Sequence, residues 1–205
     1  MNIGFFHDRA QGANKRQRTR AAMLDATVRL VAQKGMAALR INDITEEAGL
    51  ANGTFYNHFS DKDEVLLEAA LGIAAEVSRQ LDTDMTEIDD APSRVVTATR
   101  RFINIVLAEP DWAALLISGT EHLPQLRDDA SQYLRADLER GVAQGRFEIE
   151  VSGFLLKQIL ALIQVAVSSQ LLAGLDARQT DQTCEAILRM LGLTPADARR
   201  LCASA

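Results

Sequence analysis

The sequence predicts an all-α protein with a small N-terminal helical domain and a larger helical domain behind it. Only four prolines occur in 205 residues. The segment before Pro92 is rich in Ala, Leu, Arg, Glu and Gln, which favour helix over strand, and its apolar residues recur at helical spacing. An apolar fraction of 47% suffices for a buried core. We place the domains at residues 15–65 and 66–205, after an arm of residues 1–14.

The arm is expected to be mobile, because residues 1–14 show no periodicity and contain Gly4 and Gly12. The first helix then ends at Lys34, where Gly35 supplies a residue with positive φ. Its apolar stripe, which starts after Thr19, consists of Met23, Leu24, Thr27, Leu30 and Val31.

Two short helices and the start of a longer one complete the N-terminal domain. The second helix is predicted over residues 41–48 and closes at Gly49, and the third covers residues 52–59. Ser60 and Asp63 form an S-x-x-D capping box, which opens a fourth helix that leads into the larger domain.

The larger domain consists of long helices separated by helix breakers. They are predicted to begin near Pro92, Asp111 and Pro124, to cover residues 154–173 and 177–191, and to end with a short helix capped by Thr194. The apolar run of residues 154–175 is long enough to cross a membrane. However, Lys157, Gln164 and Ser168 share one helical face, which a lone membrane span would have to hide. We therefore expect a buried or interface helix and no membrane partner.

Charge is distributed unevenly along the chain. The net charge is -6, but residues 1–65 carry 9 basic and 8 acidic side chains against 13 and 20 in the remainder. Residues 15–40 hold seven basic side chains and one acid, Asp25. This asymmetry indicates a polyanionic partner for the N-terminal domain and a solubilising acidic domain behind it.

The two cysteines, Cys184 and Cys202, are too few for a disulfide framework or a tetrahedral zinc site. The opening MNIGFF lacks the basic and apolar regions of a signal peptide. We therefore expect a reduced, cytoplasmic protein with no metal and no cofactor.

A glycine corner joins the second and third helices. The corner A-G-L precedes a helix that is both polar and aromatic, which is the pattern of a helix-turn-helix. The run KRQRTR places four positive charges at a helix start, where the helix dipole disfavours them unless an anion such as phosphate lies nearby. Thr54, Tyr56 and Lys62 are typical phosphate donors. Asn57 and Asn52 carry amides that can read base edges, although Asn52 could equally be a helix N-cap.

The run from Leu24 to Leu67, with the pattern A-G-L-x-x-G-T-x-Y-x-H-F-x-x-K-x-x-x-L, resembles the DNA-binding domain of the TetR family of bacterial transcriptional regulators. The resemblance implies that residues 52–59 are the recognition helix and that Phe55 and Phe59 are core. Together with the basic run, it implies contacts to double-stranded DNA from Lys15, Arg16, Arg18, Arg40, Asn52, Gly53, Thr54, Tyr56, Asn57, His58 and Lys62.

The sequence departs from the family pattern at two helix starts. Arg40 and Ala51 stand where members commonly carry Thr and Ser. We expect Asn42 and Asn52 to cap those helices instead, and Arg40 to add a phosphate contact.

The resemblance also implies a C-terminal domain for effector binding and dimerisation. Two apolar helices would pair with a second copy as a four-helix bundle. The interface candidates are Leu155, Ile159, Leu162, Ile163, Val167, Ile187, Leu188 and Leu191. The candidates for a pocket that takes a hydrophobic or amphipathic small molecule are Phe102, Trp112, His122, Tyr133, Phe147, Phe154, Gln158 and Gln164.

The function expected from these features is a homodimeric repressor. Its recognition helices, about 34 Å apart, would bind a near-palindromic operator until a ligand releases it. A ligand-responsive activator is one alternative, and a dimeric adaptor or an enzyme without DNA binding is another. Against an enzyme, no catalytic motif occurs and His7, His58 and His122 lie in separate segments.

Overall fold

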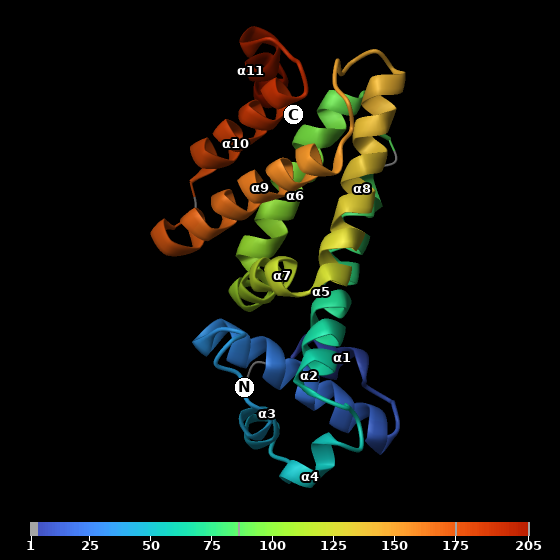
Figure 1. The fold of residues 1–205 in the computed structure, drawn as a ribbon, viewed down its shortest axis with the longest axis vertical. Helices are drawn as coiled ribbons and strands as arrows, with labels where there is room; N and C mark the ends of the chain where they lie inside the picture. Colours follow the sequence, from blue (N-terminus) through green and yellow to red (C-terminus); the bar gives the residue numbers. More distant parts are fainter. Residues whose placement is uncertain (1–3, 86, 175, 205) are drawn as a thin grey trace. The chain divides into compact units, whose positions relative to one another are not determined.

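The computed structural model describes residues 4–85, 87–174 and 176–204, and every regular element in these residues is a helix (Figure 1). The predicted all-α fold is confirmed. The helices are α1 (Phe5–Arg9), α2 (Lys15–Lys34), α3 (Ile41–Glu47), α4 (Asn52–Phe55), α5 (Lys62–Met85), α6 (Ala91–Ala108), α7 (Pro110–His122), α8 (Pro124–Ala143), α9 (Gly153–Ala173), α10 (Ala177–Met190) and α11 (Pro195–Ser204).

The chain divides into two compact units. Unit 1 comprises Met1–Ala75 and Pro110–Leu126, and unit 2 comprises Glu76–Glu109 and Arg127–Ala205. The division differs from the boundary predicted after residue 65, because α5 contributes to both units and α7 belongs to unit 1. The reason is that α7 packs along α2.

Unit 1 is built around α2, which packs against α1, α3 and α7. The helix begins at Lys15, the first residue of the basic run, and Asn14 caps it. The Asn14 Oδ1 accepts a hydrogen bond from the Gln17 N–H at 2.9 Å, and the Gln17 Oε1 accepts one from the Asn14 N–H at 3.2 Å. The helix ends at Gly35, which adopts the predicted positive φ, 78°. Met23, a member of the predicted stripe, is fully buried.

Residues 4–14 do not form the mobile arm that their sequence suggested. They contain α1, whose Phe6 and His7 N–H groups each donate to the Asp25 carboxylate at 2.9 Å. The Phe5 ring packs edge-on against Trp112 of α7, with centroids 5.2 Å apart. Contacts to two other helices therefore hold this segment in place.

Unit 2 has a core formed by α6, α9 and α10, with α11 packed on α10 and α6 (Figure 1). Ion pairs brace this core. Arg94 of α6 pairs with Asp137 of α8 at 3.0 Å, and Arg100 of α6 pairs with Asp181 of α10 at 2.6 Å. Cys184 is a buried free thiol in this core, and its burial raises its pKa to about 12.

Four of the eight predicted dimer-interface residues, Ile159, Ile187, Leu188 and Leu191, lie in this core. Leu155, Leu162 and Ile163 are only partly buried and pack against it. The other five, Ile159, Val167, Ile187, Leu188 and Leu191, are buried within the single chain, so a place for them in the interface stays a prediction. Ile159, Ile187, Leu188 and Leu191 belong to the cluster that α9 and α10 form with α6.

By length and composition, α9 is the one single helix of the described residues that could cross a membrane. It is also a core helix of unit 2, since Leu156 and Ile159 are buried in the cluster that it forms with α6 and α10. Its opposite side is exposed at Phe154, Val165 and Leu172. The helix therefore has one buried side and one apolar side that no described residue covers.

Candidate nucleic-acid interface

A tight turn at residues 48–51 joins α3 to α4. The Leu50 N–H donates to the Thr45 carbonyl at 2.8 Å, and Gly49 takes a positive φ of 67°, which residues with a Cβ rarely adopt. The helix-turn-helix corner predicted from A-G-L therefore forms.

The predicted recognition helix is shorter than expected. Regular helix covers only residues 52–55, and the chain continues to Phe59 through hydrogen-bonded turns, such as the Asn57 N–H to the Thr54 carbonyl at 3.2 Å. Phe55 and Phe59 anchor this segment, because both rings are buried with centroids 5.5 Å apart. We call residues 52–59 the recognition segment.

The outer side of the recognition segment carries exposed polar and aromatic groups. Tyr56 is 61% exposed, and Asn52, Gly53 and Asn57 are exposed as well. The cap residue of α4 is Ala51, which makes no side-chain cap hydrogen bond. The expectation that Asn52 caps α4 is therefore wrong. Asn52 is instead the first residue of the helix and is exposed.

The expectation that Asn42 caps α3 is also wrong, because the cap residue of α3 is Arg40. At the start of α3 the Asp43 carboxylate accepts a hydrogen bond from the Arg40 N–H at 2.9 Å. Asp43 also pairs with Lys34 at 2.5 Å, and this contact is the main reason why the pKa of Asp43 lies below its ordinary value. Arg40 itself is exposed beside this helix start.

The first turn of α2 lies beside the recognition segment. Lys15, Arg16 and Arg18 are exposed on it. The Arg16 Nη2 donates to the Asn57 carbonyl at 3.5 Å, and the Arg18 guanidinium donates to the carbonyl of Ala13. An open depression in unit 1 is lined by Lys15, Arg16, Thr19, Thr54, Asn57 and His58.

The depression brings together five of the predicted DNA contacts and adds Thr19. Sequence reasoning missed Thr19, although its spacing of four from Lys15 and three from Arg16 puts it on the same helix face. Lys62 lies at the first turn of α5 and is half-buried there. Cations and hydroxyls in one open depression make a surface suited to phosphate.

His58 contributes its imidazole to the depression. Its Nδ1 is buried and has no hydrogen-bond partner among the described residues. Burial lowers the pKa of His58, and the charges of Arg16 and Arg20 lower it further. The charged form of the His58 side chain is therefore disfavoured in the free protein.

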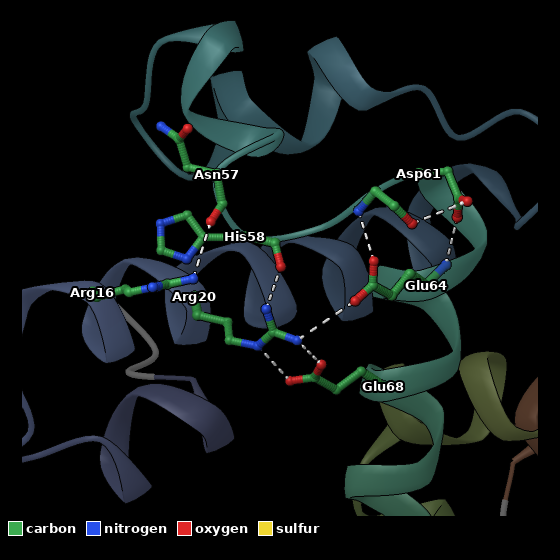
Figure 2. Close-up of polar contacts among 8 residues, drawn as sticks. Arg16, Arg20, Asn57, His58, Asp61, Glu64 and Glu68 are labelled. Carbon is green, nitrogen blue, oxygen red and sulfur yellow. Dashed lines mark hydrogen bonds and ion pairs between the residues drawn. The ribbon is translucent and has the colours of Figure 1, made fainter.

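Arg20 lies one helical turn beyond Arg16, and Figure 2 shows it between the recognition segment and α5. Its Nη1 donates to the His58 carbonyl, and its Nε donates to the Glu68 Oε1 at 2.9 Å. Its Nη2 donates to the other Glu68 oxygen and lies 3.9 Å from Glu64. Sequence reasoning assigned Arg20 no role of its own beyond its charge in the basic run, because Glu64 and Glu68 are far from it along the chain.

Asp61 and Glu64 cap the start of α5, in place of the predicted capping box of Ser60 and Asp63. The Asp61 Oδ1 accepts from the Glu64 N–H at 2.9 Å, and the Glu64 Oε2 accepts from the Ser60 N–H at 2.6 Å. These backbone hydrogen bonds are the largest cause of the lowered pKa of both carboxyl groups.

The predicted ligand-binding residues belong to both units. Trp112 and His122 belong to unit 1, where Trp112 contacts Phe5. In unit 2, Phe147 is core, because its ring packs where a Cβ on Gly141 would stand. Phe102 and Gln164 are half-buried, and the exposed side chains are Tyr133, Phe154 and Gln158.

The fold and the depression together define a helix-turn-helix protein suited to duplex DNA. The sequence model of the tetR family of bacterial regulatory proteins matches residues 23–69, and that of the tetracyclin repressor-like C-terminal domain matches residues 89–204. The chain belongs to the TetR family, as the resemblance implied. This membership sets aside the enzyme alternative, because the family consists of regulatory proteins.

Named relatives agree with this assignment. An uncharacterized HTH-type transcriptional regulator of Haemophilus influenzae is 35% identical over 88 residues, which are 42% of this chain and 42% of that protein. The crystal structure of RolR in complex with resorcinol has a TM-score of 0.73 at 29% identity, covering 93% of this chain and 96% of RolR. A TetR-family regulator from Shewanella sp. PV-4 shares the fold, with a TM-score of 0.74 at 16% identity over 83% and 96% of the two chains.

Proposed function

We propose that the protein is a homodimeric transcriptional repressor that binds a near-palindromic operator and is released by a small molecule. The observation that carries the proposal is the depression in which Lys15 and Arg16 lie beside Thr54 and Asn57. Clustered cations and hydroxyls next to outward-facing amides combine phosphate binding with base reading. The corresponding setting for this activity is the bacterial cytoplasm.

In this proposal the contacts divide into two groups. Lys15, Arg16, Arg18, Arg40, Thr19, Thr54, Tyr56 and Lys62 bind phosphates, with His58 at the edge of their depression. Asn52 and Asn57 read base edges, since both amides face outward from the recognition segment. Gly53 allows close approach of the backbone to DNA.

Dimerisation is assigned to the exposed side of α9. Phe154, Val165 and Leu172 are 71%, 66% and 91% exposed. Their spacings of 11 and 7 residues place them on one helical face. A second copy of the chain is the occupant that we propose, since a two-fold dimer presents the same patch from both partners.

The effector is assigned to the class of small phenols. This assignment rests on RolR, which is 29% identical and whose crystal structure contains resorcinol. A ligand of this class would release DNA by preferring a conformation in which the two recognition segments no longer match successive grooves. A full reversal of the equilibrium requires a preference of about 5.5 kcal/mol.

Selection of bound duplexes from a random pool tests the proposal. We expect recovery of an inverted repeat, and release of that duplex when resorcinol or a related phenol is titrated. Failure to retain any duplex at low salt contradicts the DNA-binding assignment. Retention that no phenol reverses contradicts only the effector assignment.

A further inference from the structure

We propose that Arg20 is a positioning residue for DNA recognition: it sets the conformation of the recognition segment without touching DNA itself. The inference rests on the proposed function, which assigns DNA reading to that segment. It assigns to Arg20 a role different from that of Lys15, Arg16 and Arg18, although all four belong to one basic run.

The recognition segment needs an external hold. Its regular helix is only four residues long and has no side-chain cap. So short a helix is not stable by itself, because nucleation fixes several dihedral angles for each hydrogen bond gained. Tyr56 and Asn57 extend from the turns that follow, so their directions depend on what fixes the backbone at residues 56–59.

Two arginines of α2 fix that backbone. Arg16 and Arg20 are four residues apart on one face of α2 and donate to successive carbonyls, those of Asn57 and His58 (Figure 2). The Arg20 guanidinium also lies over the Phe59 ring, 4.2 Å from its centroid. Arg20 therefore holds both the backbone and an anchoring ring of the segment.

Glu68 fixes Arg20 in turn. The two carboxylate oxygens of Glu68 accept from Nε and Nη2, a bidentate pairing that locks the plane of the guanidinium. Glu64 lies 3.9 Å from the same Nη2. The Nε, Nη1 and Nη2 groups of Arg20 all have protein acceptors, and one face of the guanidinium lies on the Phe59 ring. Arg20 therefore affects DNA binding through the recognition segment that it holds. Lysine could keep the charge but not the planar fork.

Arg29 provides a matched control. It also lies on α2, pairs with a glutamate of another helix at 2.8 Å, Glu47, and is 33% exposed against 32% for Arg20. Glu47 belongs to α3, not to the recognition segment. Arg29→Met thus removes a similar ion pair of unit 1 and leaves residues 52–59 held.

The experiment compares Arg20→Met, Arg20→Lys and Glu68→Gln with Arg29→Met in the full-length protein. The first readout is affinity for the duplex selected by the wild-type protein and for a random duplex of equal length. We expect Arg20→Met to weaken binding of the selected duplex about tenfold or more, the loss that corresponds to one charge-assisted hydrogen bond. Random-duplex affinity should fall less, because among the phosphate contacts only that of Tyr56 depends on this hold, and the salt slope should stay unchanged. Glu68→Gln should reproduce part of the loss.

Amide hydrogen exchange is the second readout, and it needs no DNA. The N–H groups of His58 and Phe59 should exchange faster in Arg20→Met and in Arg20→Lys than in Arg29→Met, at a temperature where circular dichroism shows each variant folded. If Arg20→Met does not fold, the affinities and exchange rates of Arg20→Lys and Glu68→Gln are compared with those of Arg29→Met instead.

Three results overturn the inference. A salt slope reduced by about one in Arg20→Met means a direct phosphate contact. Equal losses in Arg20→Met and Arg29→Met mean general destabilisation. Unchanged exchange at His58 and Phe59 means that Arg20 does not order the segment. If the wild type binds no duplex, the proposed function fails, while the exchange experiment still decides whether Arg20 holds the segment.

Discussion

The backbone N–H of Phe6 donates to the Asp25 Oδ1 at 2.9 Å, which ties α1 to the middle of α2. His7 donates to the other carboxylate oxygen at the same distance. Burial raises the pKa of Asp25, although both hydrogen bonds act in the opposite direction. Gly4 completes the arrangement, because a Cβ at this position would overlap the Asp25 carboxylate. The first prediction follows from this close approach.

Gly4→Ala should lower the free energy of unfolding by about 1–3 kcal/mol, because the added methyl group displaces the carboxylate from its two N–H donors. Chemical denaturation followed by circular dichroism measures this change. Gly153→Ala is the control, since a Cβ there meets nothing within 4 Å. Equal stability of Gly4→Ala and the wild type contradicts the close approach at Asp25.

Gly53→Ala should separate stability from DNA binding. A Cβ at Gly53 meets nothing within 4 Å and the position has no positive φ, so stability should be unchanged or higher by about 0.5–1 kcal/mol. Affinity for the selected duplex should nevertheless fall, because the methyl group would stand between the backbone and DNA. A variant that is stable and binds normally shows that DNA does not approach Gly53 closely.

Lys62 and Asn57 should differ in how their loss affects binding. Lys62→Ala should weaken all duplexes alike and reduce the salt slope by about one, as expected for a phosphate contact. Asn57→Ala should instead relax the sequence preference, at about 1–3 kcal/mol for the base pair it reads. Competition between selected and random duplexes over a range of salt concentrations distinguishes the two. An unchanged salt slope for Lys62→Ala removes that residue from the interface.

The Glu64 cap predicts how stability depends on pH. Hydrogen bonds from Ser60 hold the pKa of Glu64 below its ordinary 4.5. An acid with a lowered folded pKa stabilises the fold above its unfolded pKa, and this contribution is lost as the pH falls through the folded value. Glu64→Gln should therefore flatten the acid limb of the stability curve below about pH 4.5.

Equilibrium denaturation at a series of acidic pH values measures this difference. Glu46→Gln, at an exposed glutamate of α3, is the control. Parallel curves for Glu64→Gln and the wild type contradict a stabilising role of the Glu64 carboxylate.

The exposed side of α9 predicts the oligomeric state. Val165→Glu and Leu172→Glu should convert a dimer to a monomer, because each places a charge in an apolar self-complementary patch. Sedimentation velocity at micromolar concentration gives the result. Val142→Glu, at another exposed apolar residue of unit 2, should remain dimeric. A wild-type protein that sediments as a monomer contradicts the assignment.

Local signals predicted much of unit 1. The apolar stripe of α2 and the closing Gly35 are properties of neighbouring residues, and Phe55 and Phe59 followed from the family pattern. The docking of α1 could not be predicted in the same way, because it depends on Asp25, about twenty residues away, and on Trp112.

The same limit explains the errors in the candidate sites. In α9, hydrophobicity marks several faces at once, and only the packing of α6 and α10 decides that Ile159 points inward while Val165 points outward. Arg20 was counted only as one charge of the basic run, because its partner Glu68 is 48 residues away along the chain. Residue type indicates which chemistry is available, but the partner determines its use.

Trp112 is the single tryptophan of the chain, and the Phe5 ring lies against it. Its indole is therefore a built-in optical reporter of whether α1 is docked. Undocking would change the polarity around the indole and shift its emission wavelength, so the motion could be followed by steady-state fluorescence without any attached dye.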